Sequence, residues 1–173
     1  MSSTKDNIFL YDDALVDFVF DDNVANVFTD MVNRSVPGYA LSVRMISVLA
    51  EQYARSNTRL YDLGCSLGAV SFLLQQLKLK NCSIVAVDNS PAMIKRCEES
   101  LALNQAVEKL PVALRCEDIQ QTEISNASVV VLNFTLQFIA PEKRDSIIKN
   151  IYEALVPGGI LIISEKIIFT EDE

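Results

Sequence analysis

The stretch that decides the fold is Tyr61-Asp62-Leu63-Gly64-Cys65-Ser66-Leu67-Gly68. Residues 58–62 predict a strand, and the apolar residues that follow Gly68 predict a helix. Glycines between a strand and a helix let a ligand approach the backbone, and the free N–H groups of the helix N-terminus point toward that ligand. The pattern is not the GxGxxG of dinucleotide-binding proteins, because Ser66 occupies the place of the second glycine. An ordinary strand-to-helix turn remains the alternative for these glycines taken alone.

Strands and helices alternate along the rest of the chain. Further strands are predicted at 83–88, 112–116, 128–133 and 160–164, and helices begin at Pro91 and Pro141. The turn residues Pro157-Gly158-Gly159 predict the end of the second of these helices. The apolar runs at 84–87 and 129–132 lack polar alternation, which is typical of strands covered on both faces. This order predicts an α/β, Rossmann-like doubly wound fold with a mostly parallel sheet and right-handed crossovers.

Two helices precede the alternating part of the chain. The first, capped by Asp21 or Asp22 and ended before Pro37, carries apolar residues at Val24, Val27, Phe28, Met31 and Val32. The second is expected to turn inward Leu41, Met45, Ile46, Leu49 and Tyr53. We therefore divide the chain into residues 1–57, an arm and helices that cover the ligand pocket, and residues 58–173, the Rossmann-like core. Because such sheets commonly have more than five strands, we expect this core to be incomplete at its C-terminal end.

The composition restricts the chemistry. The 173 residues carry a net charge of −8 and no histidine, which excludes Ser-His-Asp and Cys-His catalysis and histidine-ligated metal sites within this chain. Cys65, Cys82, Cys97 and Cys116 form no CxxC pair, so we expect buried or half-buried free thiols and no metal. An acidic chain is not expected to bind nucleic acid directly. No apolar run can span a membrane and residues 1–7 do not begin a signal peptide, which predicts a cytoplasmic protein without membrane contact.

Polar residues follow the predicted strands at the edge where open parallel sheets bind ligands. Asp88-Asn89 lies 24 residues after Gly64, where an acid accepts hydrogen bonds from both ribose hydroxyls, with helix capping as the alternative. At the third strand, Glu117-Asp118-Ile119 could meet an adenine amino group, with a solvated acidic loop as the alternative. Asn133 ends the fourth strand, although asparagine is a poor strand residue. The coincidence of these elements at successive strand ends predicts an adenosine-containing ligand.

In this order, the elements resemble the class I S-adenosylmethionine (SAM)-dependent methyltransferases over roughly residues 58–164. SAM fits this pattern better than NAD does, because the third glycine of the dinucleotide motif is absent. Longer strings are similar to those of the carboxy-S-adenosylmethionine synthase family. They are Val19-Phe20-Asp21, Arg34-Ser35-Val36-Pro37-Gly38-Tyr39, Asp62-Leu63-Gly64-Cys65-Ser66, Asp88-Asn89-Ser90-Pro91, Asn133-Phe134-Thr135-Leu136-Gln137-Phe138 and Ser164-Glu165-Lys166.

The resemblance to this family implies a transferase that converts SAM and prephenate into carboxy-SAM and phenylpyruvate. In the family's mechanism the substrate removes a methyl proton from SAM, and the resulting ylide captures carbon dioxide. The resemblance also implies a homodimer whose product supplies a tRNA carboxymethyltransferase with the donor for 5-oxyacetyl wobble uridine. By the same resemblance, SAM or carboxy-SAM is bound by Tyr39, Gly64, Cys65, Ser66, Asp88, Asn89, Asp118, Ile119 and Asn133.

Family members continue past the end of this chain with a helical segment whose arginine and tyrosine hold the extra carboxylate. We therefore expect this chain to bind SAM or its product weakly and to be inactive. Arg34, close to Tyr39, is the candidate within the chain for binding the substrate carboxylate, with a charge at a helix C-terminus as the alternative. Two other functions stay open at this point: a conventional methyltransferase acting on a small molecule or tRNA, and a non-catalytic SAM-binding module.

Overall fold

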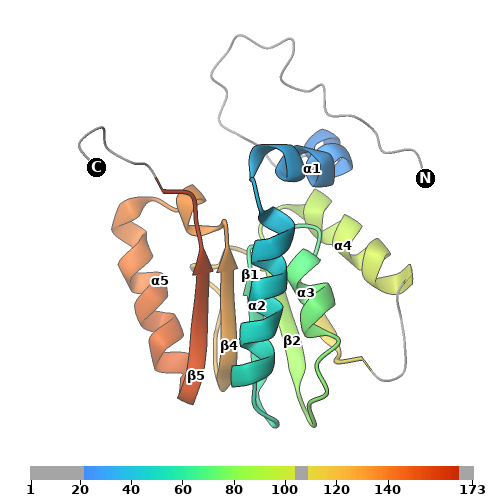
Figure 1. Cartoon of the computed structure of the whole chain (residues 1–173). Helices are drawn as coiled ribbons and strands as arrows, with labels where there is room; N and C mark the ends of the chain where they lie inside the picture. Colours follow the sequence, from blue (N-terminus) through green and yellow to red (C-terminus); the bar gives the residue numbers. More distant parts are fainter. Residues whose placement is uncertain (1–21, 104–108, 168–173) are drawn as a thin grey trace.

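The protein is built around a single five-stranded sheet (Figure 1). The structure is a computed structural model, and it describes residues 22–103 and 109–167. The strand order is β3-β2-β1-β4-β5, and all neighbouring strands are parallel. From β1 the chain adds β2 and β3 on one side and then β4 and β5 on the other. The switch point of this strand order lies between β1 and β4, so a crevice is expected outside their carboxyl ends. The strands are β1 (Arg59–Leu63), β2 (Ser83–Asp88), β3 (Val112–Cys116), β4 (Ala127–Asn133) and β5 (Leu155–Ser164).

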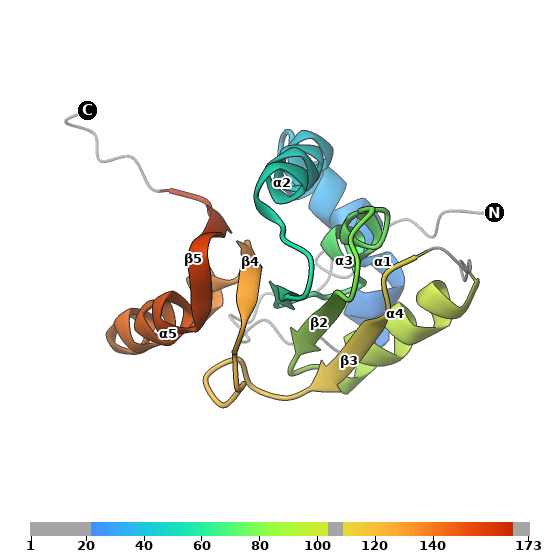
Figure 2. The same ribbon diagram turned by 90° about the horizontal axis from the view of Figure 1, so that it is seen from below.

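Helices cover both faces of this sheet (Figure 2). On one face, α2 (Tyr39–Tyr53) and α3 (Ala69–Leu74) pack over residues that include Leu60 and Val129. On the other face, α5 (Pro141–Ala154) packs over the residues next to these in sequence, Tyr61 and Val130. Successive strand residues point to opposite faces, so both faces need apolar side chains. The predicted Rossmann-like α/β fold is confirmed, and the continuous apolar runs are explained by this double coverage.

The first helix lies across the carboxyl ends of the strands, at the top of Figure 1. This helix, α1 (Asp22–Ser35), packs against α4 (Pro91–Leu103) through Val24 and Ala25, which contact Met93. The start of α4 is fixed by Ser90, whose hydroxyl oxygen accepts a 3.2 Å hydrogen bond from the backbone N–H of Met93. Ser90 therefore caps α4 just before the predicted first residue Pro91, and α1 forms a wall over the strand ends.

The inner face of α2 agrees with the prediction at Ile46 and Leu49 and differs from it elsewhere. Val43, Ile46 and Ala50 are buried against the sheet, whereas Leu41 and Met45 of the predicted face are exposed. The helix carries apolar residues on more than one side, so helical periodicity alone fits two different inner faces. The residues that pack inward include a valine and an alanine, whose small volume allows the helix to approach the sheet closely.

The segment Pro157-Gly158-Gly159 lies within β5, and not before the strand as predicted. The register against β4 shifts here, because Ala127 pairs with Leu155 whereas Val129 pairs with Ile160. The extra residues form an irregularity in β5, the outermost strand in the order of the sheet. Proline and glycine are tolerated at such irregularities in edge strands, where fewer ladder hydrogen bonds depend on them.

Some sequence predictions lie outside the described residues. These are the N-terminal arm, the Val19-Phe20-Asp21 string and the last six residues of the predicted core. Among the helices that the structure describes, none is both long enough and apolar enough to cross a membrane.

Candidate functional site

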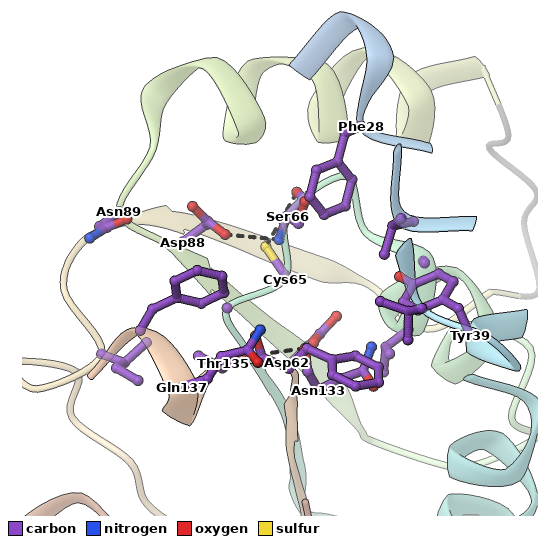
Figure 3. A pocket seen from close by; sticks show the side chains of 18 of the residues that line it. Phe28, Tyr39, Asp62, Cys65, Ser66, Asp88, Asn89, Asn133, Thr135 and Gln137 are labelled. Carbon is purple, nitrogen blue, oxygen red and sulfur yellow. Dashed lines mark hydrogen bonds between the residues drawn. The ribbon is translucent and has the colours of Figure 1, made fainter. Parts of the chain in front are cut away.

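A cavity of about 680 Å³ opens at the carboxyl edge of the sheet, beneath α1 (Figure 3). This volume lies within the range of sites that enclose a small molecule. Its walls come from α1, from the start of α2 and from the segments that follow the five strands. The structure brings together in this lining all nine residues that the sequence assigned to ligand binding: Tyr39, Gly64, Cys65, Ser66, Asp88, Asn89, Asp118, Ile119 and Asn133.

The turn between β1 and α3 forms one wall of the cavity. Gly64 has a φ of 81°, in the left-handed region, and its N–H donates a 2.8 Å hydrogen bond to the carbonyl of Val87 on β2. A Cβ atom on Gly64 would lie 2.6 Å from the Cγ2 atom of Thr135, which is closer than non-bonded carbons approach. Both the conformation and the contact therefore require glycine here. The turn can bring its backbone close to a ligand only because this residue has no side chain.

Asp88 links this turn to the end of β2. Its Oδ2 accepts a 2.9 Å hydrogen bond from the backbone N–H of Ser66 (Figure 3). Its Oδ1 accepts a 2.9 Å hydrogen bond from the backbone N–H of Ser90. Burial raises the pKa of this carboxyl, and the two backbone hydrogen bonds oppose that rise. Each carboxylate oxygen can accept a second hydrogen bond. Asp88 therefore supports the start of α4, which was the alternative to a ligand-binding role. It can also accept hydrogen bonds from hydroxyl groups of a ligand.

Asp62 is a cavity residue that the sequence reasoning did not single out, although it lies in the decisive stretch. Its Oδ2 accepts hydrogen bonds from Ser71, 3.0 Å from the backbone N–H and 2.6 Å from the hydroxyl. Burial, reinforced by the charge of Asp88 and opposed by the bonds from Ser71, raises the pKa of Asp62 to about 6. Burial and the charge of Asp62 also raise the pKa of Tyr39. A cationic group of a ligand would be stabilised beside this carboxylate.

The segment after β4 forms the opposite wall. Asn133 lines the cavity, and its buried Oδ1 accepts no hydrogen bond from the residues that the structure describes. A buried acceptor without a donor is costly, so this atom indicates where a ligand donor would bind. Phe134 has a φ of 57°, and its ring centroid lies 6.1 Å from that of Tyr39. The two rings thereby join the β4 segment to the start of α2 across the cavity.

Glu165 holds this segment in place, a role that the sequence did not reveal. Its carboxylate accepts hydrogen bonds from three consecutive backbone N–H groups: Thr135 at 2.9 Å, Leu136 at 2.6 Å and Gln137 at 3.3 Å. These groups begin the short 3-10 helix Leu136–Phe138. In the sequence, the string Ser164-Glu165-Lys166 carries only a family resemblance, because a contact between residues 30 positions apart leaves no local pattern.

Cys65 is a lining residue of low reactivity. Its thiol is buried and forms a hydrogen bond with the thiol of Cys97, and this bond together with burial raises the pKa of Cys65. The thiol therefore stays protonated and neutral near pH 7 and acts as a small apolar group. Cys82 is also buried, as expected, whereas Cys116 is exposed. Within the described ranges, no group of three or more Cys, Asp or Glu residues could hold a metal ion.

The comparisons with known proteins agree with this geometry. A family profile described as a methyltransferase domain matches residues 61–161. A carboxy-S-adenosyl-L-methionine synthase from Shewanella pealeana is 51% identical over 99% of this chain and 71% of its own length. A protein of the same name from Citrifermentans bemidjiense is 53% identical over 99% of this chain and 70% of its own length. The chain belongs to the carboxy-S-adenosyl-L-methionine synthase family.

The fold of this member of the carboxy-SAM synthase family is found in solved methyltransferase structures. A SAM-dependent methyltransferase from Clostridium acetobutylicum superposes with a TM-score of 0.63 over 80% of this chain and 56% of its own. Its sequence is 21% identical, so the likeness concerns the fold alone. The class I methyltransferase architecture predicted from the strand ends is therefore confirmed.

Charges are distributed unevenly around the cavity of this carboxy-SAM synthase family member. Asp62, Asp88 and Asp118 are lining carboxylates, and among the described lining residues Lys166 is the one cation. Arg34, the candidate for a substrate carboxylate, does not line the cavity. Its side chain is 61% exposed, and its guanidinium pairs with the carboxylate of Asp30 at 3.4 Å, one turn earlier in α1. This placement matches the alternative, a charge in the last turn of a helix.

Proposed function

We propose that this chain converts SAM and prephenate into carboxy-SAM, phenylpyruvate and water. The observation that carries the proposal is the combination of 51% identity to a carboxy-SAM synthase over nearly the whole chain with one cavity lined by all nine expected residues. The match extends over 99% of the chain, so it covers all segments that form the cavity walls, and not only the turn at Gly64.

In the proposed complex, SAM lies along the carboxyl edge of the sheet. Asp88 accepts hydrogen bonds from the ribose hydroxyl groups. Asp118 and Ile119, which follow β3, bind the adenine. The turn at Gly64 and Ser66 admits the methionine part, since it carries no bulky side chain. The unpaired Oδ1 of Asn133 accepts a hydrogen bond from the ligand, and the buried carboxylate of Asp62 stabilises its positive charges.

The proposed chemistry needs no histidine and no metal from the chain. The sulfonium of SAM acidifies its methyl C–H bonds. Prephenate loses its ring carboxyl group as carbon dioxide and its hydroxyl group as hydroxide, and becomes phenylpyruvate. The hydroxide takes a methyl proton to give water, and the methyl carbon bonds to the carbon dioxide. The residues of the cavity hold the two substrates together, so that carbon dioxide forms next to the carbon that it joins.

The proposal extends to the setting of the reaction. We propose that the protein is a cytoplasmic homodimer that does not itself bind tRNA. A separate tRNA carboxymethyltransferase then uses the carboxy-SAM to modify wobble uridine. The acidic composition, with a net charge of −8, supports the separation of this chain from the step on tRNA.

The test is mass spectrometry of products after incubation with SAM, with and without prephenate. The chain spans 71% of the length of the Shewanella pealeana relative, so a second sample is that relative with its matching part replaced by this chain. We expect carboxy-SAM only when prephenate is present. Product from the chimera alone would also support the proposal, and would show that the reaction needs the part of the relative that this chain does not match. Carboxy-SAM from neither sample would overturn the proposal, and S-adenosylhomocysteine formed with an added acceptor would support a methyltransferase.

A further inference from the structure

Asp62 is the most deeply buried of the three carboxylates that line the cavity. Only 1% of its surface is exposed, whereas Asp88 and Asp118 are half-buried. A carboxylate that has lost its hydration stays ionised only where hydrogen-bond donors or cations replace the water. Among the described residues, no cation forms an ion pair with Asp62. The ionisation of this carboxylate therefore depends on hydrogen-bond donors.

Ser71 provides these donors from the first turn of α3. Its backbone N–H donates a 3.0 Å hydrogen bond to Oδ2 of Asp62, and its hydroxyl donates a 2.6 Å hydrogen bond to the same oxygen. Ser71 is fully buried, and the other buried residues of this helix, Val70 and Leu74, are apolar. A hydroxyl buried among apolar groups is costly without a partner, so the bond to Asp62 explains why a serine is tolerated here.

The other titratable groups around Asp62 do not favour its charged form. Burial and the charge of Asp88, at the end of β2, raise the pKa of Asp62 to about 6, and the hydrogen bonds from Ser71 oppose this rise. Tyr39, at the start of α2, and Cys65, in the turn after β1, have raised pKa values and are neutral near pH 7. The adjacent elements α3 and β4 carry no titratable side chain. The hydroxyl of Ser71 is therefore the side-chain group that favours an ionised Asp62.

We propose that Ser71 is a positioning residue of the ligand site: its hydroxyl holds the carboxylate of Asp62 in one orientation and in the charged form that binds the cationic ligand SAM. This inference rests on the SAM binding of the proposed function, and it assigns a role to a residue that does not itself line the cavity. The sulfonium and amino groups of SAM are positive, so an ionised carboxylate beside them is favourable and a protonated carboxyl is not. The alternative is a purely structural contact that ties β1 to α3.

The test is the affinity of the chain for SAM, measured by isothermal titration calorimetry between pH 5 and pH 8. Ser71→Ala removes the hydroxyl and keeps the backbone N–H, and Ser71→Thr keeps a hydroxyl at the same position. Ser146→Ala is the matched control, since Ser146 is an exposed serine of α5 whose hydroxyl donates a 2.7 Å hydrogen bond to the carbonyl of Lys143. Urea unfolding at the same pH values checks that each variant is folded during the titration.

The expected result is a shift along the pH axis. In the unaltered chain, SAM affinity should fall as pH drops through about 6, where Asp62 takes up a proton. Ser71→Ala loses a hydrogen bond to a charged acceptor, so the midpoint of this fall should rise by about one pH unit. The loss of affinity is then largest near pH 6, about fivefold, and nearly absent at pH 8. Ser71→Thr and Ser146→Ala should keep the midpoint of the unaltered chain.

A loss of affinity in Ser71→Ala that is equal at all pH values would show a structural contact alone and would overturn the inference, as would an unchanged profile. A midpoint shared by the Ala and Thr variants would also count against the hydroxyl. The product assay judges the proposed function separately, because it uses the unaltered serine. If that assay yields carboxy-SAM and the midpoint in Ser71→Ala is unchanged, the reaction assignment holds and the role of Ser71 is wrong. Absence of SAM binding at every pH would contradict both.

Discussion

The carboxylate of Glu165 accepts a 2.6 Å hydrogen bond from the backbone N–H of Leu136 and thereby ties the end of β5 to the segment after β4. The same oxygen also accepts the N–H of Thr135 at 2.9 Å. A negative charge at the first N–H groups of a helical turn is favourable, because those groups have no partners within the turn. One side chain outside the nine expected residues thus positions a wall of the cavity.

Replacing Glu165 tests this positioning role. We expect Glu165→Ala to lower SAM affinity about tenfold and stability by about 2 kcal/mol, because three N–H groups lose a charged acceptor. Glu165→Gln keeps an oxygen that can accept hydrogen bonds from the N–H groups of Thr135 and Leu136. This variant should therefore retain most of the SAM affinity and most of the stability. Calorimetry and urea unfolding measure them, and Glu153→Ala on the exposed side of α5 is the control. Similar losses in the Ala and Gln variants would contradict the proposed geometry.

Asp88 provides a test of the ribose contact. In Asp88→Asn, the amide NH₂ faces either the N–H of Ser66 or that of Ser90, because only one oxygen remains for two donors. Loss of the charge and of this acceptor is expected to weaken SAM binding by about tenfold or more. Calorimetric titration with SAM measures the effect, and Glu98→Gln on α4 is a control on the same helix whose start Asp88 supports. Unchanged SAM affinity in Asp88→Asn would remove Asp88 from the binding site.

The buried carboxyl of Asp62 makes stability depend on pH. Its pKa rises from the ordinary 3.8 to about 6, so between these values the native chain holds a proton that the unfolded chain has released. The contribution of Asp62 to the free energy of unfolding therefore falls as pH rises through this window, by about 3 kcal/mol at most. Asp62→Asn lacks this contribution, so its stability should increase relative to the unaltered chain between about pH 4 and pH 7.

Urea unfolding of the ligand-free protein at the two ends of that pH range measures the difference. Asp145→Asn, a change at an exposed residue of α5, controls for the loss of one negative charge. If the stability gap between Asp62→Asn and the unaltered chain is the same at both pH values, the pKa of Asp62 is not raised.

Gly64 can be compared with a second glycine of the same conformation. Gly38 has a φ of 80° with no atom within 4 Å of a would-be Cβ, whereas a Cβ at Gly64 would meet Thr135. Gly38→Ala should cost about 1 kcal/mol, the cost of the left-handed conformation alone. Gly64→Ala should cost about 3 kcal/mol, since it adds a steric clash. Adding Thr135→Ala should recover about 1 kcal/mol of this. Strictly additive changes in unfolding free energy would show that the two residues do not compete for space.

The sequence was sufficient for the elements whose causes are local or periodic. β2 and β3 begin and end where predicted, because each is a short apolar run between turn residues. Asp88, Asp118 and Asn133 were found because residues at the ends of parallel strands converge at one edge of the sheet. Tyr39 and the complete set of nine came from the resemblance to the family. The predicted inward face of α2 was correct at Ile46 but wrong at Leu41 and Met45, because a helix that is apolar on several sides is oriented by its neighbours and not by its own period.

Glu165 and Lys166 directly follow the predicted fifth strand, so the same reasoning would place them at this edge of the sheet, but it could not give their contacts. Glu165 reaches Thr135 across 30 positions of sequence, and Lys166 becomes a lining residue only because β5 lies beside β4. Such roles depend on the register of the sheet, which no local pattern of residues contains. The irregularity at Gly158 has the same origin, since it exists only in the pairing of β5 with β4.

The close approach of Gly64 and Thr135 also limits how this family can change over evolutionary time. A larger residue at position 64 is tolerable only after position 135 has become smaller, and that smaller residue would lose the 2.9 Å hydrogen bond from the Thr135 hydroxyl to the carbonyl of Leu63. Each single step on such a path passes through a less stable protein. Positions 64 and 135, which are distant in the sequence, are therefore expected to change together or not at all. Substitutions that adapt the site to a new ligand are expected at residues outside this pair.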